Sequence, residues 1–209
     1  MRAWKIDTTG LPAYQTESSD FFKYIYTGTA FAAPNNPIYM PPGMLYVYEI
    51  DDSLTVPLNV LIPTSGDAVY EWVMHINYVG STSVGRVSLL PNDTTYSNQF
   101  GHAYGFFSDA SSSGDSSSVT LGESSFRLLP YYGDTASGNP SGARGLIGIG
   151  TSKRGGYTSY ENAMRPVNSG WRWYGGSSHW RNPAVDWDSL GTLSMNVQIY
   201  GRFLLRRIY

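Results

Sequence analysis

The segment that decides the fold is Val69-Tyr-Glu-Trp-Val-Met-His-Ile-Asn-Tyr-Val79. Its two faces differ: one holds Tyr70, Trp72, Met74, Ile76 and Tyr78, and the other holds Glu71, His75 and Asn77. Alternation with a period of two is typical of a β-strand that buries one face. No window of about a dozen residues has the three-and-four spacing of a helix without an interrupting Gly or Pro. We therefore expect an all-β protein.

Four other segments alternate in the same way: Met44–Ile50, Leu54–Ile62, Arg86–Leu90 and Leu193–Leu205. Pro57 marks the second as an edge strand or a bulge, and Pro91 ends the third. Turn-rich stretches lie between strands, at 33–37, 109–118 and 133–142. Short strands at intervals of roughly ten residues with Gly, Pro and Ser between them indicate a β-sandwich or jelly roll with long loops.

The chain divides into two unequal parts. Residues 1–42 alternate aromatic groups with Pro and Asn breaks, and we expect an extended arm or edge strands that dock on a neighbouring subunit. Residues 43–209 are expected to form a single β-sandwich or jelly-roll domain, since the strong final strand has to pair with strands formed by earlier residues.

The composition favours an assembling protein over a charged, freely solvated one. Charged residues make up 14% of the 209 residues, against about 25% in ordinary domains, and the net charge is −2. Aromatic residues reach 15%, and tyrosine is enriched at interfaces. We therefore expect a homo-oligomer.

Several classes of site and partner are not expected. The absence of cysteine excludes disulfides and thiolate metal sites, and fits a protein made in a reducing cytoplasm. Residues 1–10 lack the apolar core of a signal peptide, and no stretch is long enough for a membrane span. Without a basic arm or an arginine-aromatic groove pattern, nucleic acid is not an expected partner either.

No catalytic signature is found, so we expect a non-enzymatic protein with no cofactor and no metal. His75, His102 and His179 are not placed in a recognisable triad pattern. Asp186 and Asp188 flank Trp187 and offer the alternative of a glycan-cleaving pair, although turn residues before the last strand are favoured. The acidic pairs Asp51-Asp52 and Asp109/Asp115 lack a calcium ligand ladder and are interpreted as hydrated turns.

One aromatic cluster stands out near the end of the chain, with four of the six tryptophans within 17 residues. Two interpretations stay open: a surface that stacks on sugar rings, or indoles that fill the end of the core or a subunit interface, which is favoured. The candidate binding residues are Trp171, Trp173, Tyr174, Trp180, Arg181 and Trp187.

The stretch from Asp188-Ser-Leu-Gly-Thr-Leu193 to Gly201-Arg-Phe-Leu-Leu-Arg-Arg-Ile-Tyr209 resembles the closing strand of bacteriophage tail and fibre-type proteins. That resemblance implies a surface-exposed virion component, often a homotrimer, made in the host cytoplasm and bound to other virion proteins. The chain has no repetitive stalk, which favours a capsid decoration (cement) protein or a head or tail appendage over a fibre. The alternative is a carbohydrate-binding or host-receptor-binding module that uses the cluster from Trp171 to Trp187.

Overall fold

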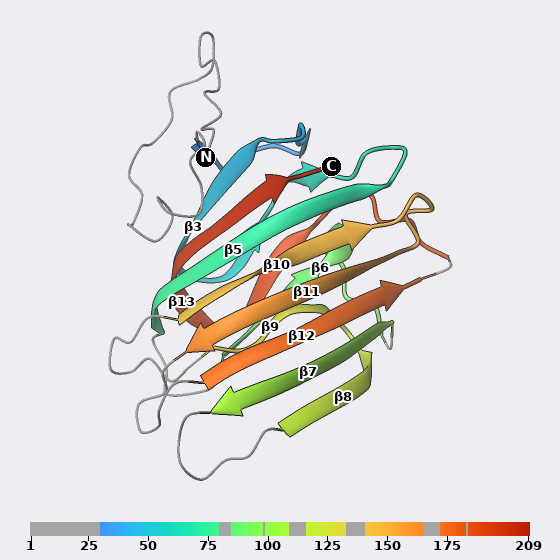
Figure 1. Cartoon of the computed structure of the whole chain (residues 1–209). Coiled ribbons are helices and arrows are strands. Elements are labelled where there is room, and N and C mark those ends of the chain that lie inside the picture. The colour runs from blue at the N-terminus through green and yellow to red at the C-terminus, as the bar shows by residue number, and fades with distance from the viewer. Residues whose placement is uncertain are drawn as a thin grey trace, which may run out of the picture.

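The computed structural model describes residues 30–79, 85–97, 99–108, 116–132, 141–164, 172–182 and 184–209 (Figure 1). Within these ranges, every regular element is a β-strand except one 3-10 turn, η1 (Pro91–Asp93). The prediction of an all-β fold is confirmed. The described residues include no helix of the length and hydrophobicity that a membrane crossing requires.

A long twisted sheet forms one layer (Figure 1). Neighbouring strands in it are antiparallel except β1 and β3, which are parallel. In spatial order its strands are β1 (Ala30–Ala32), β3 (Leu45–Pro57), β13 (Thr192–Arg207), β5 (Ala68–Val79), β10 (Ser141–Ile149), β11 (Gly155–Met164), β12 (Arg172–Arg181), β7 (Phe100–Ser108) and β8 (Ser116–Glu123).

A second, narrower layer covers one face of this sheet. It consists of β6 (Gly85–Leu90) and β9 (Phe126–Tyr132), which pair with each other and lie behind β10, β11 and β12 in Figure 1. A small parallel pair, β2 (Ile38–Tyr39) and β4 (Val60–Leu61), lies apart from the long sheet. The protein is therefore a β-sandwich, as the spacing of strands and turns predicts.

The two layers are joined by β13, which takes part in both. Its first residues, Thr192 to Met195, pair with β6, whereas Ile199 to Arg207 pair with β5. On its other side β13 pairs with β3, and register shifts around Ile199 mark a bulge where the strand bends. Gly201 follows the bulge, and a Cβ atom there would overlap the carbonyl oxygen of His75. A bulge bends a strand and increases its twist, which allows one strand to serve two layers.

The core lies between the layers and follows the predicted alternation. Tyr70, Trp72, Met74 and Ile76 of β5 are fully buried, as are Leu193, Phe203 and Leu205 of β13. The Phe203 ring stacks on Trp72 at 6.0 Å and lies 6.0 Å from Tyr48. The hydroxyl of Tyr48 donates a hydrogen bond of 2.7 Å to the carbonyl oxygen of Leu58, so its polar end is satisfied inside the core.

The strand expected over Leu54–Ile62 is wrong in its bounds. β3 continues to Pro57, and the backbone then turns at Asn59, whose φ is 54°. Leu54 is consequently 49% exposed, although Leu58, Val60 and Ile62 are buried as predicted. The Asn59 side chain donates a hydrogen bond of 2.8 Å to the carbonyl oxygen of Pro34, which stabilises this turn. Asn tolerates positive φ, which is why the break falls there.

The described portion of the first 42 residues belongs to the sandwich. β1 pairs with the edge of β3, the Phe31 ring packs against Tyr46, and Met40 is fully buried. Residues 1–29, which carry most of the expected docking arm, lie outside the described residues.

Candidate functional site

Two tryptophans of the predicted aromatic cluster lie in the core. Trp180, near the end of β12, is 1% exposed, and Trp187, in the loop before β13, is 0% exposed. Their rings meet edge to face at 5.2 Å. Phe100 stacks on Trp180 at 6.0 Å, and Phe126 meets Trp187 edge to face at 5.4 Å. These rings connect β7, β9 and β12 across the sandwich, and neither indole faces solvent for stacking on a sugar.

Three other members of the predicted cluster are residues of β12. Trp173 and Tyr174 are strand residues of β12, paired with Phe107 and Phe106 of β7. Arg181 is exposed at the end of β12. Trp171 lies outside the described residues.

The two aspartates beside Trp187 are held by basic residues of the β10–β11 turn. Arg154 Nε donates a hydrogen bond of 3.0 Å to Asp186 Oδ1, and Lys153 Nζ forms an ion pair with Asp188. The backbone N–H of Trp187 also donates a hydrogen bond of 2.6 Å to the carbonyl oxygen of Lys153. Both carboxylates therefore fasten the Trp187 loop to a neighbouring turn.

Asn92 is an organising residue that the sequence reasoning missed. Its Oδ1 accepts hydrogen bonds from the backbone N–H groups of Asp188 and Ser189, at 2.8 and 2.9 Å. Its side-chain amide nitrogen donates a hydrogen bond of 2.7 Å to the carbonyl oxygen of Asp186. The signal was present in Pro91-Asn92-Asp93, because Asn readily adopts the positive φ of 55° found there.

The three histidines occupy unlike positions. His75 is half-buried on β5, paired with Arg202 of β13. His179 is exposed on β12, where its ring covers Gly101 so closely that a Cβ atom on that glycine would overlap it. His102 of β7 is buried in the sandwich, 2% exposed.

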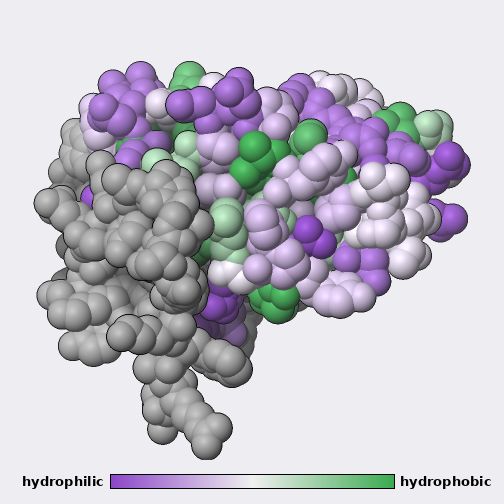
Figure 2. Space-filling model, turned by 90° about the horizontal axis from the view of Figure 1, so that it is seen from above, coloured by the Kyte–Doolittle hydropathy of each residue, from purple (hydrophilic) through white to green (hydrophobic). Residues whose placement is uncertain are grey.

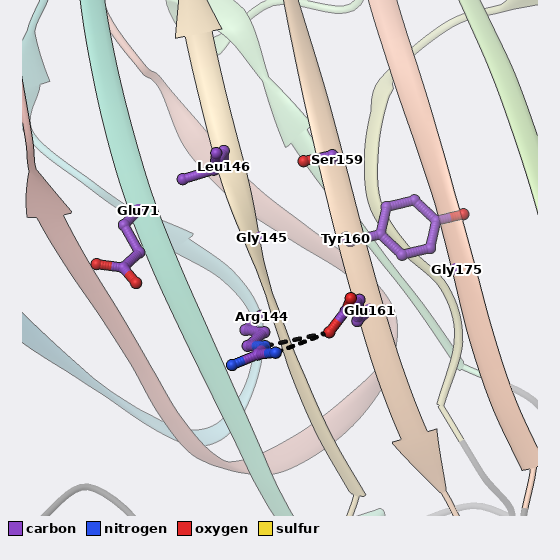
Figure 3. Close-up of a pocket in the computed structure, with 8 residues that line it drawn as sticks. All are labelled: Glu71, Arg144, Gly145, Leu146, Ser159, Tyr160, Glu161 and Gly175. Carbon is purple, nitrogen blue, oxygen red and sulfur yellow. Dashed lines mark hydrogen bonds and ion pairs between the residues drawn. The ribbon is translucent and has the colours of Figure 1, made fainter. Parts of the chain in front are cut away.

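His102 and Tyr160 form a buried polar pair. His102 Nε2 lies 2.7 Å from Tyr160 Oη, although their strands, β7 and β11, are separated by β12. Figure 3 shows the Tyr160 ring pointing toward β12, and there it crosses Gly176, where a Cβ atom would overlap the tyrosine hydroxyl. Burial lowers the pKa of His102 to about 4, and the Arg127 guanidinium adds to that effect. His102 is therefore neutral at pH 7 and serves as a hydrogen-bonding core residue.

The outer face of the long sheet, turned away from β6 and β9, carries the most organised charged groups. Arg206 of β13 pairs with Glu71 of β5, and Arg144 of β10 pairs with Glu161 of β11, the latter through contacts of 3.0 and 3.2 Å. We call these four residues the charged strip. All four side chains are accessible, from 27% for Glu71 to 64% for Arg144.

An open hollow of about 410 Å³ lies over the middle of this strip (Figure 3). At Gly175, a Cβ atom would have no neighbour closer than 4.0 Å, so the missing side chain leaves space there. The lining residues are Glu71, Arg144, Gly145, Leu146, Ser159, Tyr160, Glu161 and Gly175. The hollow holds paired charges and small side chains, and suits contact with a polar surface.

Among the described residues, no three His, Asp or Glu side chains come together as metal ligands. No protein-family model matches the chain, and no curated protein sequence is significantly similar to it.

Proposed function

We propose that this chain is a non-enzymatic structural component of a bacteriophage virion. It forms a surface-exposed β module that assembles with copies of itself and with other virion proteins. Within the particle, the roles that suit it are capsid decoration or a head or tail appendage.

The observation that carries the proposal is the use of reactive and aromatic residues to hold the fold together. Trp180 and Trp187 fill the core, and Asp186 and Asp188 fasten a loop to Arg154 and Lys153. The buried His102 bonds Tyr160. Side chains that would make the best sugar-stacking or hydrolytic groups therefore have structural contacts, which favours a scaffold over an enzyme or a lectin.

The position of the phage-like C-terminal stretch supports the same proposal. That stretch forms β13, which pairs with β3, β5 and β6 and so joins the two layers of the sandwich. The similarity to phage tail and fibre-type proteins therefore concerns the strand on which this fold is built.

The exposed surface supports assembly through polar contacts. Figure 2 shows small, separate hydrophobic groups among hydrophilic residues on the face seen from above. Tyr39, Tyr157 and Tyr209 are 59%, 51% and 61% exposed, and tyrosine is enriched at protein interfaces. Such a surface supports self-association, with a homotrimer as the arrangement implied by the resemblance.

Immunogold labelling of phage particles from the producing culture tests the virion role. Labelling at regular positions on intact particles is expected, together with the intact chain in the particle proteome. If the chain is found only in the particle-free supernatant, the proposal is wrong. Hydrolysis of a host polysaccharide that Asp186→Asn or Asp188→Asn abolishes without changing the melting temperature would instead identify an enzyme.

A further inference from the structure

The charged strip runs across four neighbouring strands with strictly alternating sign. In the spatial order β13, β5, β10 and β11, its residues are Arg206, Glu71, Arg144 and Glu161. Because adjacent strands lie about 4.8 Å apart, the strip spans roughly 14 Å. The register sets Arg206 opposite Glu71, and Arg144 opposite Glu161 one side-chain row further along the strands.

This order makes the strip complementary to itself. Read from one end the signs are plus, minus, plus, minus, and read from the other end every sign is reversed. Two copies can be placed face to face by a two-fold axis that lies in the interface, perpendicular to the strip. Because this axis reverses the order of the strip, each charge then meets its opposite. A two-fold interface uses the same patch on both partners, so such a patch has to be complementary to itself.

From this self-complementarity we infer that the outer face of the long sheet is an interface for a second copy of this chain, paired face to face through the charged strip. The inference rests on the self-association stated in the proposed function. A two-fold contact pairs two copies, so it joins homotrimers to one another and does not form the homotrimer that the resemblance implies.

The surroundings of the strip suit close approach of a second sheet. Gly175 leaves space beside the Arg144–Glu161 pair, and Ser159 lines the same hollow. Nearby, the ring of Tyr157 lies flat over Gly148, so closely that a Cβ atom there would overlap it. The accessible charges and Tyr157 are groups of the kind found at protein interfaces.

The energetics favour a network over separate surface pairs. A single exposed ion pair contributes about 0–1 kcal/mol, because water screens it and two long side chains have to be ordered. In the face-to-face pair, each guanidinium lies between two carboxylates while solvent is excluded. Partners with the wrong order of charges meet like signs, so the strip contributes specificity as well as affinity.

Charge swaps that keep both intramolecular ion pairs test this inference on the full chain. R144E/E161R changes the order to plus, minus, minus, plus, and E71R/R206E changes it to minus, plus, plus, minus. Each swapped strip repels a copy of itself but complements the other swapped strip. Melting curves and circular dichroism verify that the variants fold.

The dissociation constants are measured by sedimentation equilibrium, and mixed species by native mass spectrometry. Each double variant should self-associate at least about tenfold more weakly than the wild type, because like charges then face each other. An equimolar mixture of the two should form heterodimers, and the quadruple variant should recover self-association. The swap R154D/D186R, of the 3.0 Å ion pair between the β10–β11 turn and the Trp187 loop, is the matched control outside the strip and should leave association unchanged.

The outcomes separate this interface from the proposed function. If the wild type associates but neither double swap weakens it, or the mixed variants form no heterodimer, the interface is elsewhere and self-assembly still stands. A wild type that stays monomeric at every concentration overturns the interface and self-association together, and particle labelling then decides the virion role alone.

Discussion

The indole ring of Trp187 lies directly over Gly156, so closely that a Cβ atom on this glycine would overlap it. Gly156 is in β11, and Trp187 reaches it from the loop that precedes β13. The space that a side chain would fill on one strand is thus filled by a ring from another part of the chain.

Gly156→Ala should lower the free energy of unfolding by about 1–3 kcal/mol, because the added methyl group displaces Trp187. Gly142→Ala is the matched control in a strand, since its Cβ atom would meet only Met74 O at 3.8 Å. Urea unfolding of both variants measures the difference. If the two variants unfold with the same free energy, the Trp187 loop moves aside for the added methyl group without loss of stability.

Asn92→Ala should destabilise the protein by about 1–3 kcal/mol, because it leaves the backbone groups of the Trp187 loop without their partner. Asn92→Gly keeps the positive φ but removes the amide, so a similar loss is expected. If Asn92→Gly is as stable as the wild type, the backbone conformation matters and the hydrogen bonds do not. Thermal unfolding distinguishes the two.

The stability should fall as the pH drops from about 6.5 to about 4. His102 has a pKa of about 4 in the folded protein against 6.5 ordinarily, so the unfolded chain binds a proton first as the pH falls. This lowers the free energy of unfolding by about 3 kcal/mol over that window, with no further loss below it. Above pH 6.5 the contribution is fully present.

His102→Gln removes this titration while retaining groups that can bond Tyr160. Urea unfolding at several pH values should therefore show a shallower decline between pH 6.5 and 4 in the variant than in the wild type. If the free energy of unfolding falls equally in the variant and the wild type, the acid sensitivity comes from carboxylates and not from His102.

Trp180→Ala and Trp187→Ala should each cost about 3–5 kcal/mol, as expected for a large buried aromatic residue. Arg181→Ala, at the exposed end of the same strand, should change the stability by less than about 0.5 kcal/mol. Melting temperatures are recorded alongside binding to a glycan array. Glycan binding lost with an unchanged melting temperature in Trp180→Ala would favour a lectin.

The strands with regular apolar alternation could be predicted from the sequence, and those built with glycine could not. β5 and β13 bury the residues that their period of two indicates, from Tyr70 to Ile76 and from Leu193 to Leu205. In contrast, the six described strands between residues 100 and 181 showed no such period. There, inward positions such as Gly156 and Gly176 carry no side chain, and rings from Trp187 and Tyr160 fill their space.

The candidate site was only partly accessible to sequence reasoning for a related reason. The aromatic cluster near Trp180 was visible as composition, but its burial depends on Phe100 and Phe126, which lie more than fifty residues earlier in the chain. The charged strip depends on register between strands that are distant in sequence, as with Arg206 and Glu71. No local pattern carries that information.

Among the described strands, β13 is the last to be synthesised, yet it separates β3 from β5 and also binds β6. While the ribosome is still translating, these earlier strands lack the partner that completes their hydrogen bonding. Unpaired strand edges and exposed apolar faces are the features that drive aggregation of incomplete chains. Folding should consequently wait until β13 has emerged from the ribosome and then be slow, as for other sheets built from distant pairings. Until then the nascent chain should depend on chaperones.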